Sequence, residues 1–153
     1  MKPAFRILLA EDNPGDVFLV KEALRRYGVD CNLTVADNGQ EGWDLIEAGD
    51  ADPARAFDLF MIDLNLPARP GVELVARIRS ARGTMAKAPV LIFTSSSSAR
   101  DRAAANRAGA NYYFCKPSNL EQFLELGSIV RHFSQLRAPS GLEMSRTVTE
   151  KNS

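Results

Sequence analysis

The sequence predicts an α/β fold in which five parallel strands form one doubly wound sheet with helices on both faces. Short runs rich in Ile, Leu, Val and Phe recur along the chain, and helix-like segments separate them. The runs are apolar throughout rather than alternating, as expected for strands buried on both faces. The length of 153 residues suits one ordinary domain with its own core.

Five segments have the length and composition of buried strands, and a helix is expected after each. The strands are placed at 5–10, 32–36, 58–63, 89–94 and 111–115, and the helices at about 14–27, 39–48, 72–81, 98–108 and 120–136. The first helix carries clear signals, because Asn13 can cap it, Pro14 suits its first position and Gly28 can end it. The domain is therefore expected over 1–137. Apolar periodicity ends there, so 138–153 is expected to be a tail that is flexible or docks on a partner.

Composition excludes several classes of function. The formal net charge is zero, so no overall field recruits nucleic acid or an anionic membrane. No apolar stretch is long enough to span a bilayer, and the N-terminus lacks a signal-peptide pattern. Cys31 and Cys115 stand in apolar runs without metal-site spacing, so they are expected to be free thiols. These features favour a cytoplasmic protein that binds neither nucleic acid nor membrane.

Polar side chains stand where four of the predicted strands end. Glu11 and Asp12 follow the first strand, Asp63 ends the third, Thr94 ends the fourth and Lys116 follows the fifth. Ligands of an open parallel sheet bind beyond the carboxyl ends of its strands, so these five groups are expected to converge on one edge.

Three carboxylates brought together repel one another unless a cation compensates them. Oxygen ligands without histidine or thiolate suit Mg²⁺ better than Zn²⁺. A divalent ion, an ammonium group and a hydroxyl around one carboxylate form a receptacle for a phosphoryl group. The carboxylate of Asp63 would then be the nucleophile.

Four segments carry a resemblance to a known family: LLAEDNPGD, MIDLNLPARPG, VLIFTSSS and GANYYFCKPSN. Together they are similar to the receiver domains of bacterial two-component response regulators over about 5–136. The resemblance implies a flavodoxin-like sheet with strand order 2-1-3-4-5. It also implies a signalling role in which a sensor histidine kinase donates a phosphoryl group.

The resemblance assigns a role to each matching residue. Asp63 is the expected phosphoacceptor, and Mg²⁺ is expected on Asp12, Glu11, Asp63 and the backbone carbonyl of Asn65. Thr94 is expected to be the switch hydroxyl.

Strand five and the residues after it carry three further expectations. Lys116 is expected to bind a phosphoryl oxygen, Tyr113 to be the switch aromatic, and the Lys116–Pro117 peptide bond to be cis.

Plainer interpretations stand beside these. Glu11 and Asp12 could simply favour the positive end of the first helix, and Asp16 is expected to do only that. Residues 95–98 are expected to be loop and helix cap. His132 has no partner that would make it a phosphotransfer residue.

Two rival functions are compatible with parts of this pattern. A Mg²⁺-dependent hydrolase would use Asp63 on small phosphate esters, but it usually has a second carboxylate two residues later, where this chain has Asn65. A degenerate receiver would only bind partners, yet all the expected site residues are present. The chain is thus expected not to be an enzyme beyond its own phosphorylation and slow dephosphorylation.

Two helices suggest how a signal would leave the domain. The alanine-rich helix 98–108 buries little and should be weakly held. The last helix carries an apolar arc of roughly 240°, more than one sheet face needs. Either the tail covers the excess or a homodimer does, with a face built from Leu126, Ile129, Phe133 and Leu136.

The chain looks most like single-domain regulators associated with bacterial phytochromes, on the evidence of EDNPGD, DLNLPARPG and the C-terminal tail. That resemblance suggests a light-sensing kinase as donor, an unknown downstream protein as target, and a switch in partner binding or dimerisation through the fourth helix, the fifth strand and the fifth helix.

Overall fold

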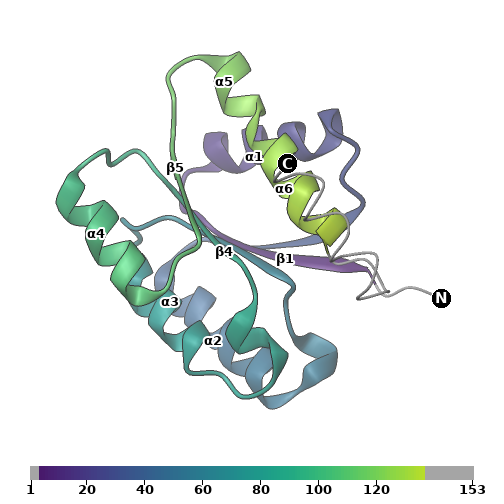
Figure 1. Cartoon of the computed structure of the whole chain (residues 1–153), viewed down its shortest axis with the longest axis vertical. Helices are drawn as coiled ribbons and strands as arrows, with labels where there is room; N and C mark the ends of the chain where they lie inside the picture. The colour runs from purple at the N-terminus through teal and green to yellow at the C-terminus, as the bar shows by residue number, and fades with distance from the viewer. Residues whose placement is uncertain (1–3, 137–153) are drawn as a thin grey trace, which may run out of the picture.

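The computed structural model describes residues 4–136, and they form one five-stranded parallel sheet in the order β2-β1-β3-β4-β5 (Figure 1). The predicted fold class and strand order are confirmed. The strands are β1 (Phe5–Ala10), β2 (Cys31–Ala36), β3 (Leu59–Ile62), β4 (Val90–Thr94) and β5 (Tyr112–Cys115). The tail expected at 138–153 lies outside the described residues.

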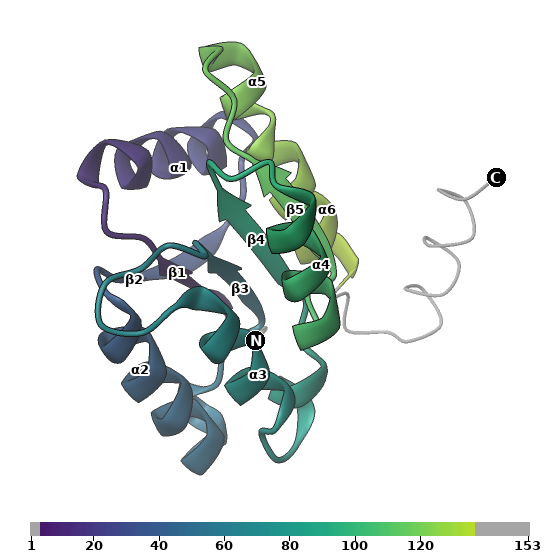
Figure 2. The same ribbon diagram turned by 90° about the vertical axis from the view of Figure 1, so that its left-hand side faces the viewer.

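Helices cover both faces of the sheet, α2, α3 and α4 on one side and α1, α5 and α6 on the other (Figures 1 and 2). Their bounds are α1 (Pro14–Arg26), α2 (Gly39–Ala51), α3 (Gly71–Arg79), α4 (Ala99–Ala108), α5 (Leu120–Leu124) and α6 (Leu126–Leu136). Two short 3₁₀ helices, η1 (Pro53–Arg55) and η2 (Thr84–Lys87), lead into β3 and β4. Within 4–136, no helix is long and apolar enough to cross a lipid bilayer.

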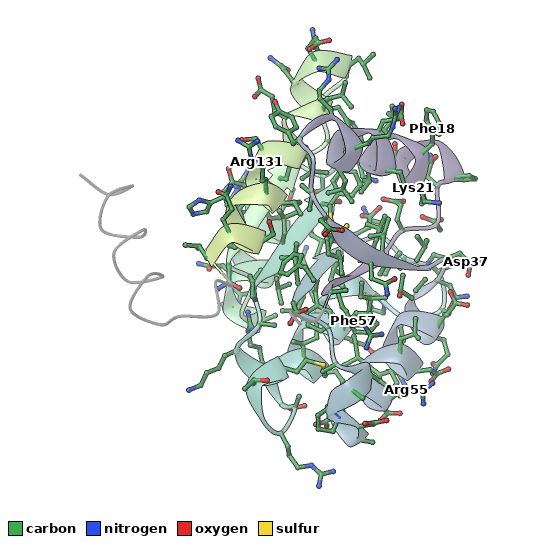
Figure 3. All side chains as sticks on the ribbon, turned by 90° about the vertical axis from the view of Figure 1, so that its right-hand side faces the viewer. Phe18, Lys21, Asp37, Arg55, Phe57 and Arg131 are labelled. Atoms are coloured by element: carbon green, nitrogen blue, oxygen red, sulfur yellow. The ribbon has the colours of Figure 1, made fainter. Side chains whose placement is uncertain are left out.

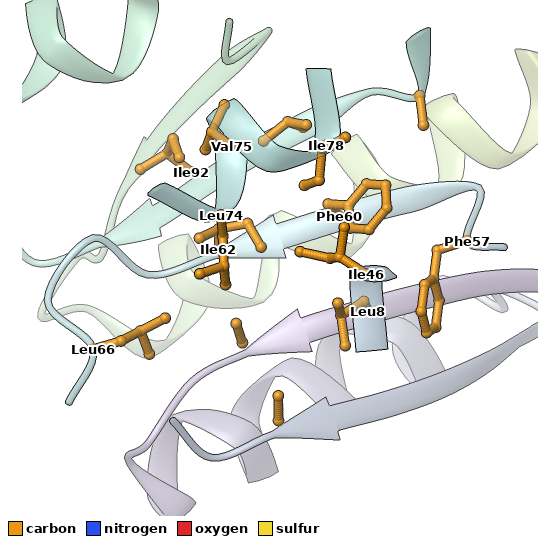
Figure 4. Close-up of a cluster of buried hydrophobic side chains, with 14 of the residues drawn as sticks. Leu8, Ile46, Phe57, Phe60, Ile62, Leu66, Leu74, Val75, Ile78 and Ile92 are labelled. Atoms are coloured by element: carbon orange, nitrogen blue, oxygen red, sulfur yellow. The ribbon is translucent and has the colours of Figure 1, made fainter. Parts of the chain in front are cut away.

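The sheet divides the core in two because successive strand residues point to opposite faces. Leu8 and Ala10 of β1 face α2 and α3, while Ile7 and Leu9 face α1 and α6. Figure 4 shows the first cluster, where Phe60 lies between the strands and the helix layer. In β3 and β4, where both sides are filled, every strand residue is apolar except Thr94, the last residue of β4.

Local signals explain where most elements begin. The Asn13 side chain accepts hydrogen bonds from the backbone N–H groups of Gly15 and Asp16, which caps α1 as predicted. The side chain of Ser98 caps α4 in the same way by accepting from the N–H of Asp101. Gly28 follows α1 with a φ of 63°, a conformation that suits glycine.

The last helix differs from the prediction in two respects. It breaks at Glu125 into α5 and α6, and part of its apolar arc, including Leu126 and Val130, is buried within the chain. Leu126 is fully buried in the cluster that α1 and α6 share, so the prediction that it lies on a dimer face is wrong. The arc is wide because α6 packs against both the sheet and α1.

The α1–α6 contact depends on a residue without a side chain. A Cβ atom on Gly127 would lie 2.2 Å from the carbonyl oxygen of Ala23 in α1 and 2.6 Å from Cδ2 of Tyr27. Contacts this short require one helix to move, since the nearest obstacle is backbone.

We expect Gly127→Ala to lower the free energy of unfolding by about 1–3 kcal/mol, the usual cost of overpacking, despite the better helix propensity of alanine. Urea unfolding followed by circular dichroism measures the change. Ser128→Ala, at the exposed neighbouring position, is the matched control and should change stability little. An unchanged midpoint for Gly127→Ala would show that the two helices are not so closely packed.

Candidate functional site

Four of the five polar residues predicted to converge meet beyond the carboxyl ends of the strands: Glu11, Asp12, Asp63 and Lys116. Three of them continue the sheet's hydrogen bonding just past their strands: the N–H of Glu11 donates to Ala36 O, that of Asp63 to Ala10 O and that of Lys116 to Thr94 O. The last two bonds measure 3.1 and 2.7 Å. The backbone of the sheet therefore fixes where these side chains start.

Three of the carboxylates form a cluster suited to a divalent cation. One oxygen from each of Glu11, Asp12 and Asp63 lies within 4.8 Å of the others. Glu11 and Asp63 are buried, whereas Asp12 is exposed. Burial raises the pKa of Glu11 to about 7, although hydrogen bonds from Lys116 and from the N–H of Asn13 oppose it. Oxygen ligands and closely spaced carboxylates suit a hard cation such as Mg²⁺. The cluster is open to solvent on the side of Asp12.

Lys116 supplies the positive charge among these acids. Its Nζ lies 2.6 Å from Glu11 Oε1, 2.8 Å from Asp16 Oδ2 and 3.0 Å from Asp63 Oδ2. It also lies 4.7 Å from the centroid of the Phe93 ring in β4. Burial alone would lower the pKa of Lys116, but the carboxylates outweigh it and hold the pKa above its ordinary value. The ammonium group is thus charged and held by three carboxyl groups.

Asp16 belongs to this site, although the sequence assigned it only to the helix terminus. It lies in the first turn of α1, and its carboxylate reaches Lys116 from the solvent side. The sequence does contain a pattern that places Asp16 at the site. The helix that follows the first strand begins at the same sheet edge as the other acids. Its first-turn acid therefore points toward that edge.

The β4–α4 segment links Thr94 to Tyr113. Thr94 is fully buried, and its Oγ1 accepts from the N–H of Ser96 at 3.3 Å. The hydroxyl of Tyr113 donates to the carbonyl oxygen of Ser96 at 2.8 Å. The Ser96 hydroxyl in turn donates to Asp101 Oδ2 in α4 at 2.6 Å, and the Arg102 guanidinium lies 4.3 Å from the Tyr113 ring centroid. Ser96 of the β4–α4 loop thus contacts β4, β5 and α4.

The β3–α3 segment holds Asp63 from the other side. The N–H of Asn65 donates to Asp63 Oδ1 at 3.2 Å. A Cβ on Gly71 would lie 2.2 Å from the carbonyl oxygen of Asp63, so only glycine lets α3 start this close. Ala68 in the same segment has a φ of 74°, a sterically unfavourable value for a residue with a side chain.

The expected cis bond is not present. Residues 4–136 contain no cis peptide bond, so Lys116–Pro117 is trans and that prediction is wrong. The trans isomer is favoured for most X–Pro bonds. The Lys116 backbone is already held through Thr94 O, and its side chain reaches the acids in this geometry.

Comparison with known proteins places this site in a family. The family model for the response regulator receiver domain matches residues 7–126. The chain belongs to the response regulator receiver domain family. Such domains transduce signals in two-component systems, in which they pair with sensor histidine kinases.

Individual relatives add detail. Response regulator Rcp1 of Synechocystis sp. is 28% identical over 128 residues, covering 83% of this chain and 86% of Rcp1. The transcriptional regulatory protein TrcR of Mycobacterium tuberculosis is 32% identical over 136 residues, covering 88% of this chain. The receiver chain spans about half the length of TrcR, 49%.

Two solved structures are similar to the receiver over nearly all of their own length. The phosphorylated cyanobacterial phytochrome response regulator RcpA has a TM-score of 0.77 and 29% identity, covering 90% of this chain and 100% of RcpA. The Mn²⁺-bound form of Rcp1 has a TM-score of 0.73 and 27% identity, covering 86% and 94%. The resemblance to receivers associated with phytochromes is thereby confirmed.

We expect Lys116→Met to destabilise the metal-free protein, because it leaves Glu11 and Asp63 buried together without a cation. Removing one partner of a buried pair costs about 3–5 kcal/mol, and the lower end applies here because Asp16 can turn to water. Added Mg²⁺ should restore more stability to the variant than to the wild type, as thermal unfolding will measure. Lys21→Met, at an exposed position in α1, is the control. A variant as stable as wild type without metal would show that Lys116 does not compensate these acids.

Proposed function

We propose that Asp63 accepts a phosphoryl group from a sensor histidine kinase in a Mg²⁺-dependent reaction, and that phosphorylation switches partner binding. The observation that carries the proposal is the convergence of Glu11, Asp12, Asp63 and Lys116 at the ends of three strands. A buried carboxylate held by a lysine and beside two further acids suits phosphoryl transfer better than a structural ion pair, which needs only one acid.

Asp63 is the nucleophile in this proposal. Its carboxylate is oriented by the N–H of Asn65 and the ammonium of Lys116. One carboxylate oxygen forms a bond to phosphorus while the bond between phosphorus and the kinase's histidine nitrogen breaks. The released imidazole takes up a proton from water, and Asp63 becomes a mixed anhydride.

Mg²⁺ would be held by Glu11, Asp12, Asp63 and the backbone carbonyl of Asn65, and it would neutralise charge on the phosphoryl oxygens. Asp12 is exposed, so the ligand set is open to solvent on one side. Lys116 would bind another phosphoryl oxygen. The Mn²⁺-bound form of the related Rcp1, together with the acidic cluster in this chain, supports the binding of a divalent cation.

The signal would pass through Thr94 and Tyr113. A phosphoryl oxygen on Asp63 would accept a hydrogen bond from the Thr94 hydroxyl, which now accepts from Ser96 N. Movement of Thr94 would then shift the Ser96 carbonyl that holds Tyr113. Only Ala105 of α4 is fully buried, so a small free energy is enough to move this helix.

The donor we propose is a kinase linked to a phytochrome photoreceptor in the cytoplasm. The support is the similarity to RcpA, which is a phytochrome response regulator, and to Rcp1. A hydrolase is the alternative function. Asn65 stands where such an enzyme usually has its second acid, so only turnover of phosphate esters would favour it.

We expect a small phosphodonor with Mg²⁺ to add one acid-stable, base-labile phosphoryl group to the protein, detected by intact mass. Asp63→Asn should take up none, whereas Asp44→Asn, at an exposed position in α2, should behave like wild type. Phosphorylation of Asp63→Asn would refute the assignment. Steady turnover of phosphate esters would favour the hydrolase instead.

We also propose a homodimer through β5 and α6. A groove of about 500 Å³ there is lined in part by Tyr112, Ile129 and Phe133, and Tyr112 is 44% exposed although it is aromatic. Phe133 and Leu136 line a second groove, of about 340 Å³, next to the start of β4. β5 is the last strand of the sheet on this side, so a second copy could cover both the edge and the groove.

We expect Ile129→Asp to lower the molar mass measured by sedimentation, because a carboxylate would be buried in the interface. Gln122→Asp, exposed on α5 outside the groove, adds the same charge and should leave the mass unchanged. Circular dichroism checks that both variants fold. Equal masses for wild type and Ile129→Asp would exclude this dimer.

A further inference from the structure

Every N–H donor of the Lys116 ammonium group has a carboxylate acceptor in this structure. A lysine ammonium has three N–H donors. Here they meet Glu11, Asp16 and Asp63 at 2.6, 2.8 and 3.0 Å. A phosphoryl oxygen can therefore gain Lys116 as a donor only if one of the three carboxylates gives it up.

Burial indicates which carboxylate gives way. The side chain of Asp16 is 22% exposed, while those of Glu11 and Asp63 are 1% and 8% exposed. Glu11 is also held by the N–H of Asn13 at 3.1 Å, and Asp63 carries the incoming group. A released Asp16 carboxylate meets water and stays beside the positive end of α1, which favours an anion. Releasing Asp16 therefore costs the least.

We infer that Asp16 is a positioning residue that holds Lys116 in the unphosphorylated protein and is displaced from it by the phosphoryl oxygen. This inference rests on the proposed function. Asp16 therefore competes with the phosphoryl group for Lys116. It keeps the ammonium group at the site, and it lowers the affinity of the site for a phosphoryl group.

A beryllofluoride titration of the full chain in saturating Mg²⁺ tests the inference, with beryllofluoride as the phosphoryl analogue. Asp16→Asn should bind it about tenfold more tightly, because a neutral amide oxygen holds the Lys116 ammonium group less strongly than a carboxylate does. Asp16→Glu, which can still reach Lys116, should stay close to wild type.

A charge control separates contact from general electrostatics. Asp37 lines a groove together with Glu11 and Asp12, and Figure 3 shows it at the end of β2. Asp37→Asn removes the same charge from the same edge and should change affinity by less than about twofold. A gain equal to that of Asp16→Asn would overturn the role of the Lys116 contact.

A spectroscopic readout on the wild type completes the test. The ¹³C resonance of the Asp16 carboxylate should move toward that of a free carboxylate when beryllofluoride binds. An unmoved resonance, or an Asp16→Asn variant that binds no more tightly than wild type, overturns the inference while leaving Asp63 as acceptor. Wild-type protein that binds no beryllofluoride overturns the proposed function, and the inference with it.

Discussion

The site depends on one interaction, the ammonium group of Lys116 held among the carboxylates of Glu11, Asp16 and Asp63. Without a cation, Glu11 and Asp63 would face each other as buried like charges, which raises the free energy of the folded state. The parallel sheet makes the arrangement possible because it brings the carboxyl ends of β1, β3 and β5 to one edge. The apolar core holds those ends in place.

The same arrangement makes the site responsive. The electrostatic energy of a charge-compensated cluster changes whenever charge is added or removed, and the phosphoryl group proposed for Asp63 would add charge there. The change can reach α4 because Ser96 is in contact with Thr94, Tyr113 and Asp101 together. Since α4 contributes only Ala105 to the fully buried core, little packing opposes its movement.

The sequence was most informative where one interaction dominates. Buried strands, with the Asn13 and Ser98 helix caps, follow from local patterns, and polar residues at strand ends predicted which side chains meet. Prediction was weaker where partners come from distant segments. Asp16 was assigned to the helix terminus because its partner, Lys116, lies 100 residues away. Leu126 was placed on a surface because nothing local reveals that α6 packs against α1 through Gly127. The Lys116–Pro117 isomer depends on tertiary contacts that no pattern encodes.

The central claim is that Asp63 carries the phosphoryl group. Borohydride converts an aspartyl phosphate into homoserine, which marks the modified residue for peptide mapping by mass spectrometry. After treatment with a phosphodonor and Mg²⁺, we predict homoserine at position 63 and unmodified aspartate at Asp12 and Asp16. Homoserine at Asp12 or Asp16, or at no position in protein that has taken up phosphate, would contradict the account.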